Sequence, residues 1–361
     1  MRQAAVAADH LPMQRASHGR FPAVAGVAAL ATGGFAAWVG LGVGGAVVVR
    51  YVDDLATVLA ALAATLFCAL AARRHDRRMR TFWGLLCGAA ACWTLAETVW
   101  AVYELVLHTE VPIPSWADLG YLLAVPLTIA ALIAHPATRQ GNAQRARSLL
   151  DGLVLATSLL FLSWTIVLWP LWRSSDLSTS GGVIGLAYPF SDVVIVFFIV
   201  LAVRGMTGRN RLSLWCLLAG LLAMALSDTG YAYLTQVNSY DTGQLIDTGW
   251  FAAYLGIALG AYSSRGGQVL AAKVDHSQPT LASLVIPFFP VLLALGVFGV
   301  QTRLGHQPDR ASWAMALALV VLVLFRQALL LLGVARSKPE TGAILPSGLP
   351  SWRSESVSGP R

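Results

Sequence analysis

Three acidic residues lie inside long apolar stretches of the sequence, where a charged side chain is unfavourable. Glu97, Asp192 and Asp228 are each surrounded by Ala, Leu, Val and aromatic residues. A charged group in the interior of a bilayer costs at least about 2.5–3.5 kcal/mol, so each acid needs a partner, water or a proton. Such acids bind a cation, carry a proton, or hydrogen-bond to neighbouring helices and fix their packing.

Two of these acids belong to segments that resemble each other. The first copy contains Glu97, Trp100, Asp118, Gly120 and Tyr121, and the second contains Asp228, Tyr231, Asp247, Gly249 and Trp250. The copies are 131 residues apart at the first acid and 129 apart at the Asp-x-Gly-aromatic motif. Each copy indicates a helix with a buried acid, a short loop and a second helix. Because the copies are four spans apart, we expect parallel internal hairpin repeats.

The candidate ligand-binding residues are Glu97, Trp100, Asp118, Tyr121, Asp192, Asp228, Tyr231 and Asp247. We expect the acids to border one polar, aromatic-lined pocket that opens to the outside and receives a cation, a proton or a small polar ligand. A purely structural role is the alternative at each position. Ser115 and Asp118 have the spacing of a helix capping box. An acid in the first turn, as at Asp118 and Asp247, also suits the positive end of the helix dipole.

Other residues whose types could take part in chemistry are interpreted as structural. The string Tyr51-Val52-Asp53-Asp54 resembles a polymerase metal motif, but we expect it in a short external turn and interpret the match as coincidence. Asp151, four residues after Arg147, is interpreted as an ordinary first-turn acid. The cysteines and histidines are not spaced as metal or haem ligands, so no metal or cofactor is expected. No nucleotide-binding or hydrolase motif is present, and the sequence gives no positive argument for an enzyme.

The elements that must position these residues are membrane-spanning helices. The 361 residues are 57% hydrophobic and only 12% charged, whereas a soluble domain has roughly a quarter charged residues. The apolar blocks have about 20 residues each, the length needed to cross a bilayer. We expect an all-α, polytopic transmembrane bundle of about ten spans, with nine as the alternative. The spans are near residues 23–48, 54–72, 82–107, 118–135, 149–172, 183–203, 212–234, 248–263, 280–300 and 313–334.

The basic residues set the expected orientation. With ten spans, 20 of the 25 Lys and Arg residues fall on the side of the two termini and only 4 on the other. The positive-inside rule then predicts cytoplasmic N- and C-termini in the cell membrane. We expect a cytoplasmic segment over 1–20, a transmembrane helical domain over 21–335 and a disordered cytoplasmic tail over 336–361. This distribution accounts for the net charge of +7 without a nucleic-acid partner.

Several motifs resemble a known signalling family. They are the Trp93-x-x-x-Glu97-x-x-Trp100 helix, the loop VPIPSWADLGY at 111–121, the YPFSD segment at 188–192 and Arg326-Gln327. These look like the N-terminal multi-pass sensor region of actinobacterial membrane-bound diguanylate cyclases and cyclic-di-GMP phosphodiesterases. The resemblance covers roughly residues 82–332. In that family the last helix continues into cytoplasmic catalytic domains. Here we expect Gly333 and Pro339 to interrupt it and those domains to be missing, so the resemblance implies no cyclic-di-GMP turnover.

The expected function is therefore that of a sensor-like or accessory signalling module with an externally facing acidic and aromatic pocket. The alternative is a small-solute or proton-coupled transporter, which the buried acids, the prolines in the spans and the parallel repeat also allow. The lipid bilayer is the expected partner. A cytoplasmic signalling protein and a homodimer are left open.

Overall fold

The computed structural model describes residues 21–135, 142–169, 180–205, 211–264, 288–305 and 307–337. Within these residues every regular element is a helix, which confirms the predicted all-α class. The helices are α3 (Phe21–Leu41), α4 (Ala46–Arg74), α5 (Arg77–Ala101), α6 (Trp116–Ala134), α7 (Asn142–Ser163), α9 (Ser180–Gly205), α10 (Arg211–Gln236), α11 (Asp247–Ser263), α13 (Phe288–Arg303) and α14 (Arg310–Ser337). Two π-helical segments, η1 (Val102–Val106) and η3 (Trp164–Leu168), continue α5 and α7. The predicted 1–20 segment, and residues 338–361 of the predicted tail, lie outside the described residues.

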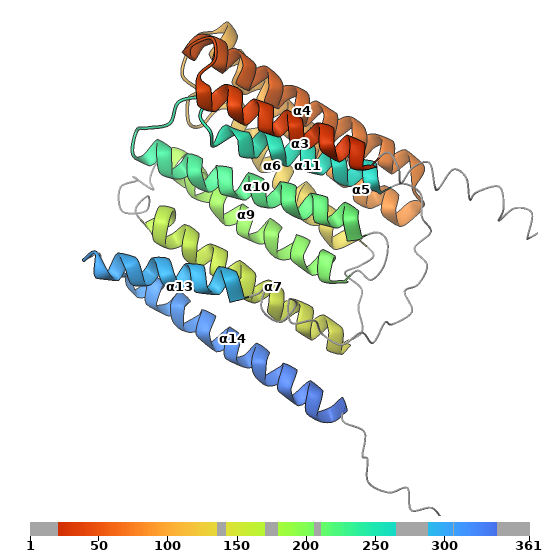
Figure 1. Ribbon diagram of the computed structural model, residues 1–361, viewed down its shortest axis with the longest axis vertical. Coiled ribbons are helices and arrows are strands. Elements are labelled where there is room, and N and C mark those ends of the chain that lie inside the picture. The colour runs from red at the N-terminus through yellow and green to blue at the C-terminus, as the bar shows by residue number, and fades with distance from the viewer. Residues whose placement is uncertain are drawn as a thin grey trace, which may run out of the picture.

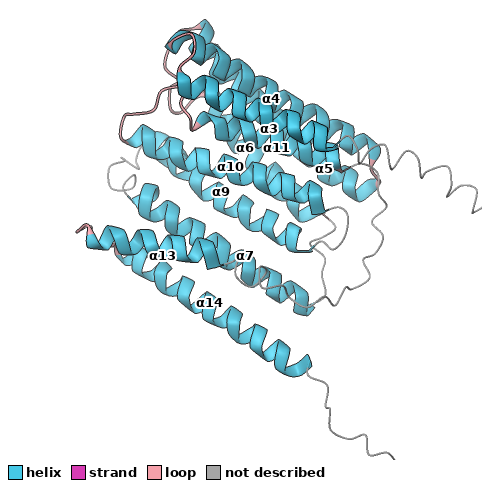
Figure 2. Ribbon diagram, viewed as in Figure 1, coloured by secondary structure: helices cyan, strands magenta, loops and turns pink. Residues whose placement is uncertain are grey.

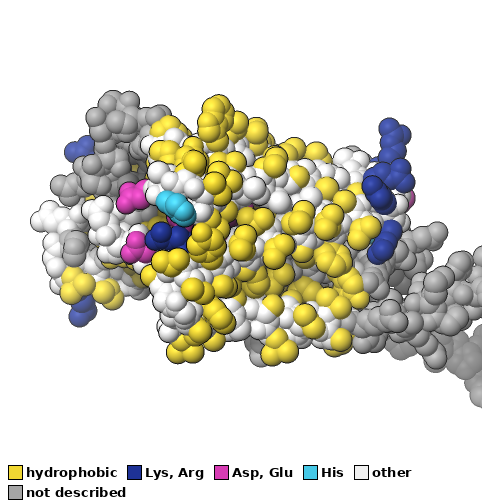
Figure 3. Space-filling view, turned by 90° about the horizontal axis from the view of Figure 1, so that it is seen from above, with side chains coloured by type: hydrophobic (Ala, Val, Ile, Leu, Met, Phe, Trp, Pro, Cys, Tyr) yellow, Lys and Arg dark blue, Asp and Glu magenta, His cyan; other side chains and the backbone are white. Residues whose placement is uncertain are grey.

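The helices have the length and composition of membrane spans. Eight of the described helices are long and apolar enough to cross a membrane, and Val291–Arg303 of α13 is a shorter apolar helix. Helix α11 has 17 residues. Hydrophobic side chains cover the middle of the face seen in Figure 3, and charged side chains gather toward its two ends. An apolar band between polar ends matches the hydrocarbon core between two aqueous layers. The chain is therefore a multi-pass helical membrane protein.

Six helices form a closed ring of pairwise contacts, and this ring positions the site. The order around the ring is α4, α5, α6, α9, α10, α11 and back to α4. Helix α3 packs outside the ring against α11 and α4. A second group, formed by α7, α13 and α14, lies to one side and meets the ring through the contact of α7 with α9 (Figure 1). Each group has its own cluster of buried apolar side chains.

The two ends of the bundle differ. The turn between α3 and α4, the loops from α5 to α6 and from α10 to α11, and the turn between α13 and α14 all lie at one end, here called the loop end (Figure 2). The opposite end, where α4 meets α5, is called the arginine end because it carries Arg73, Arg74, Arg77, Arg78 and Arg80. Both ends of the described chain, Phe21 and Ser337, lie at the arginine end (Figure 1).

The first hairpin differs from the prediction. Helix α3 ends at Leu41 and α4 begins at Ala46, so the turn comes before the predicted one. Three residues of the turn, Gly42, Gly44 and Gly45, have φ of 62°, 91° and 84°, a backbone region that glycine adopts without steric cost. The string 51–54 therefore lies in α4, and the prediction of an external turn there is wrong. Because the residues on both sides of the glycines are apolar, the predicted first span continued past the turn to residue 48.

Two predictions about α7 and α14 are also wrong. Helix α7 begins at Asn142, so Asp151 lies in its third turn and not in its first. Its carboxylate accepts a hydrogen bond from Arg326 of α14, and both side chains are buried. Helix α14 continues through Gly333 to Ser337, so Gly333 does not interrupt it. The second proposed interruption, Pro339, lies outside the described residues.

A capping interaction joins the same two elements at the loop end. Asp309 precedes α14 and accepts hydrogen bonds from the backbone N–H groups of Ala311 and Ser312, at 3.0 and 3.3 Å. The indole N–H of Trp164 in η3 also donates to Asp309, at 3.2 Å. Partial burial raises the pKa of Asp309, but the hydrogen bonds from Ser312, Trp164 and the backbone outweigh it and hold the pKa below its ordinary value.

Candidate ligand-binding cavity

A cavity of about 570 Å³ lies among the helices of the ring, beneath two loops of the loop end. Six acids line it: Asp53, Asp54, Glu97, Asp118, Asp192 and Asp228. Eight aromatic residues also line it: Trp93, Trp100, Tyr121, Tyr188, Tyr231, Tyr240, Trp250 and Tyr254. None of the described residues that line it is Lys, Arg or His. Its volume falls within the roughly 300–1,000 Å³ typical of small-molecule sites.

The structure brings seven of the eight predicted site residues to this one cavity. They are Glu97 and Trp100 of α5, Asp118 and Tyr121 of α6, Asp192 of α9, and Asp228 and Tyr231 of α10. The eighth, Asp247, is not among the lining residues. Its carboxyl group instead contacts the carboxyl group of Asp53, which does line the cavity.

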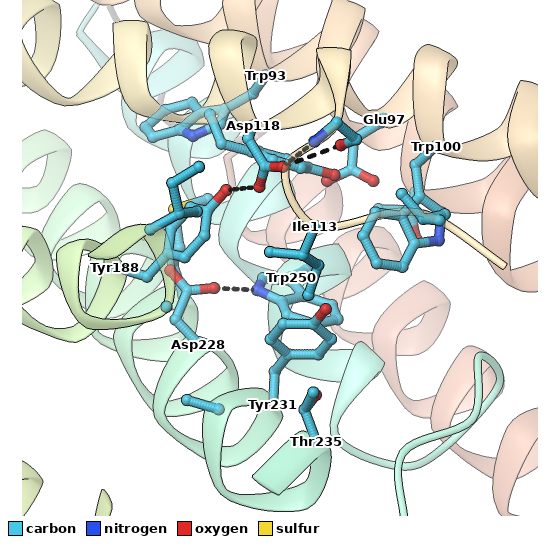
Figure 4. Close-up of a pocket in the computed structure, with 18 of the residues that line it drawn as sticks. Trp93, Glu97, Trp100, Ile113, Asp118, Tyr188, Asp228, Tyr231, Thr235 and Trp250 are labelled. Atoms are coloured by element: carbon cyan, nitrogen blue, oxygen red, sulfur yellow. Dashed lines mark hydrogen bonds between the residues drawn. The ribbon is translucent and has the colours of Figure 1, made fainter. Parts of the chain in front are cut away.

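Asp118 is positioned by the start of α6. Its Oδ2 accepts hydrogen bonds from the backbone N–H of Ser115 at 2.6 Å and from the Ser115 hydroxyl at 3.0 Å. This arrangement confirms the predicted capping box. The hydroxyl of Tyr188 in α9 donates to Oδ1 of the same carboxylate (Figure 4). Asp118 therefore both caps α6 and lines the cavity.

Two aromatic residues of α11 hold the acids of the neighbouring helices. The indole N–H of Trp250 donates to Oδ1 of Asp228 at 2.6 Å (Figure 4). The hydroxyl of Tyr254 donates to Oε1 of Glu97 at 2.7 Å. Because Trp250 and Tyr254 are four residues apart, they lie on one face of α11. These bonds connect α11 to α10 and α5 and support a packing role for both acids.

Asp247 organises the loop between α10 and α11. Its Oδ2 accepts hydrogen bonds from the backbone N–H groups of Gly243 and Gln244, both at 2.8 Å, and the Tyr240 hydroxyl donates to Oδ1 at 3.1 Å. Burial, together with the nearby Asp247 carboxylate, raises the pKa of Tyr240 well above its ordinary value. Tyr240 is therefore a neutral hydrogen-bond donor. Asp247 lies in the first turn of α11, the position predicted for it.

One wall of the cavity is a cluster of aromatic rings centred on Tyr231. Its ring centroid lies 4.7 Å from that of Tyr240, 5.8 Å from that of Trp250 and 6.2 Å from that of Trp100, each in an edge-to-face arrangement. Edge-to-face packing stabilises such clusters and fixes ring orientation. The wall therefore offers rigid aromatic surface next to the carboxylates.

Three of the acids that line the cavity each have one carboxyl oxygen without a hydrogen-bond partner among the described residues. Oδ1 of Asp53, Oδ2 of Asp54 and Oδ2 of Asp192 have no hydrogen-bond partner among the described residues. Their residues are only 4%, 6% and 7% exposed. A buried acceptor without a donor costs about 1–3 kcal/mol, and more when it is charged. These three oxygens are the groups of the cavity that most need a donor from a ligand.

Sequence reasoning missed Asp53 and Asp54 as site residues. The predicted turn covered them, and their resemblance to a polymerase motif was interpreted as coincidence. The signal that could have found them is the Gly42-x-Gly44-Gly45 cluster, because α3 ends at Leu41, seven residues before the predicted end of the span at residue 48.

Arg50, a basic residue at the rim of the cavity, forms an ion pair with Glu104. Glu104 of η1 accepts a hydrogen bond from Thr242 at 2.6 Å, and its other oxygen lies 3.7 Å from Nε of Arg50. The Arg50 side chain is 46% exposed. Arg50 therefore pairs with Glu104 at the rim, next to solvent, and its charge also acts on Asp54 of the cavity.

The chemistry of the lining suits an organic cation better than a metal ion. No group of three or more His, Cys, Asp or Glu side chains in the described part of the chain is arranged to hold a metal. Aromatic faces attract ammonium and guanidinium groups through the ring quadrupole. Carboxylates accept short, strong hydrogen bonds from the same groups.

Comparison with known proteins finds no match to this chain among protein families, curated proteins or solved structures. The function is therefore inferred from the cavity and the residues that line it.

Proposed function

We propose that this multi-pass membrane protein is a sensor-like module that binds a small organic cation in the acidic, aromatic-lined cavity. The observation that carries the proposal is the composition of the cavity wall, with six acids, eight aromatic residues and no basic side chain among the described lining residues. A cation that enters gains charge-assisted hydrogen bonds of about 1.5–3 kcal/mol each. Contact with desolvated aromatic faces adds about 2 kcal/mol or more.

Binding is tested with ligands that match in shape and differ in charge. Titration calorimetry on the purified protein in lipid nanodiscs compares 4-aminobutan-1-ol with butane-1,4-diol. We expect the amine to bind and the diol to show no heat of binding. Glu97→Gln, inside the cavity, is expected to weaken amine binding, whereas Asp241→Asn, an exposed acid of the α10–α11 loop, leaves it unchanged. Equal binding of amine and diol contradicts the proposal.

The sensor role and the orientation are proposed together. The resemblance to the sensor regions of cyclic-di-GMP enzymes supports sensing, and the 20 to 4 bias of basic residues supports a loop end that faces outside. A membrane-impermeant thiol reagent applied to whole cells tests the orientation. We expect it to label Asp241→Cys at the loop end and not Arg77→Cys at the arginine end, and the reverse pattern contradicts the proposal.

A transporter is the second candidate, because buried acids with unsatisfied oxygens are also what a cation- or proton-coupled carrier needs. Proteoliposomes loaded with buffer and given labelled amine separate the two. Uptake that Asp228→Asn abolishes favours the transporter. Amine binding without uptake, together with co-purification of a cytoplasmic signalling protein, favours the sensor.

A further inference from the structure

We propose that the ligand is a linear diamine, with one ammonium group bound beside Asp53 on α4 and the other beside Asp192 on α9. This inference rests on the proposed function, since it specifies the class of cation for the same cavity.

Two pairs of facing carboxyl groups carry the inference. Asp53 of α4 contacts Asp247 of α11, and Asp192 of α9 contacts Asp228 of α10. Two carboxylates in contact repel each other unless a proton or a cation lies between or beside them. Each pair also contains a buried oxygen without a partner among the described residues, Oδ1 of Asp53 in one and Oδ2 of Asp192 in the other. Each pair is therefore a place for one cationic group.

The two pairs lie on different sides of the cavity. In the order of the ring, α4 and α9 are separated by two helices in either direction. The Glu97 carboxyl group of α5 interacts with one acid of each pair, Asp247 and Asp228. A single ammonium group binds at one pair and leaves the other unsatisfied. A ligand with a cationic group at each end satisfies both.

The cavity wall also offers apolar surface for the methylene groups between the two ammonium groups of the ligand. Val125 of α6, Ile195 of α9 and Met224 of α10 line the same cavity. Their apolar side chains suit methylene groups, whose burial away from water is favourable. Carboxyl pairs for the ends and apolar surface for the middle together match a linear diamine.

Two hairpins of the ring, α5–α6 and α10–α11, pack alike. A Cβ atom on Gly120 of α6 would meet Cys92 and Ala96 of α5, and one on Gly249 of α11 would meet Ala223 and Ser227 of α10. Both sets of positions are related by the same offsets of 129 and 131 residues that relate the sequence repeats. Helices α5 and α6 thus pack in the same register as α10 and α11, as expected for a parallel repeat.

The test compares one and two cationic groups on the unmodified protein. Binding to the full chain in nanodiscs is measured for 4-aminobutan-1-ol and for a series of diamines from propane-1,3-diamine to octane-1,8-diamine. We expect one length in the series to bind about ten- to a hundredfold more tightly than the amino alcohol, the gain from one additional charge-assisted contact. If the amino alcohol binds as tightly as every diamine, the diamine inference fails and the cation proposal stands. If no amine binds, both fail.

Single substitutions locate the two ends. Asp53→Asn and Asp192→Asn are each expected to reduce the preference for diamine over amino alcohol to about onefold, while binding of the amino alcohol persists. Retained amino alcohol binding shows that the variants are folded. Asp241→Asn, at an exposed site, is expected to keep the full preference. A preference that survives either cavity substitution overturns the assignment of that end.

Discussion

The close approach of α5 and α6 predicts that Gly120→Ala destabilises the protein. A Cβ at Gly120 would lie 2.8 Å from the carbonyl oxygen of Cys92 and 2.9 Å from Cβ of Ala96, where ordinary contacts are 3.4–4 Å. The first obstacle is backbone and cannot rotate away, so the helices must separate. Overpacking of this kind costs about 1–3 kcal/mol, and the better helix propensity of Ala returns up to about 1 kcal/mol. With a cost in the middle of that range, about 2 kcal/mol, the net loss is about 1 kcal/mol.

Thermal unfolding in one detergent, followed by intrinsic fluorescence, measures the effect. The matched control is Gly84→Ala in α5, where nothing lies within 4 Å of the added Cβ and the unfolding temperature is expected to stay equal or rise. Gly120→Ala is expected to lower it, and also to weaken amine binding, because the adjacent Tyr121 hydrogen-bonds to Glu97. An unfolding temperature equal to that of the control variant refutes the close packing of α5 on α6.

Three further changes have outcomes that the structure specifies. Asp309→Ala removes the cap of α14 and is expected to cost about 0.5–2 kcal/mol at neutral pH. Because the folded pKa of Asp309 lies below 3.8, its carboxylate stabilises the fold above that pH. The difference in unfolding temperature from the parent should therefore shrink as the pH falls through the folded pKa. Arg326→Met removes the guanidinium group that donates to the buried Asp151 carboxylate, a loss of about 3–5 kcal/mol that the double variant with Asp151→Leu should largely restore; a double variant no more stable than the single one contradicts the pairing. Trp250→Phe removes the indole donor to Asp228 and should cost about 1.5–3 kcal/mol, the loss of one charge-assisted bond, with a lower unfolding temperature; an equal loss in a background of Asp228→Leu, which has no acceptor, would show that the bond is not the cause.

The sequence was sufficient for the class of fold and for much of the cavity. Apolar blocks of bilayer length predict helices, and Glu97, Asp192 and Asp228 stand out because few acids occur in such blocks. Their convergence with Trp100 and Tyr231 follows from the helix periodicity and the repeated motif. The capping box of Ser115 and Asp118 depends on residues three apart, so local sequence specified it fully.

Other features depend on tertiary contacts or on turns that apolar composition conceals. Asp53 and Asp54 were misplaced because the glycine turn lies within a continuous apolar run. The pair of Asp151 and Arg326 joins residues 175 positions apart in sequence. Neither residue carries a local signal of its partner, so only the packing of α14 on α7 reveals the pair.

Occupation of the cavity by an organic cation can be observed in a structure determined with saturating butane-1,4-diamine. We expect ligand density inside the ring, with nitrogen atoms within hydrogen-bond distance of the carboxylates of Asp53 and Asp192, and no density there with butane-1,4-diol. A cavity that stays empty with the diamine, or that holds the diol equally well, would contradict this expectation.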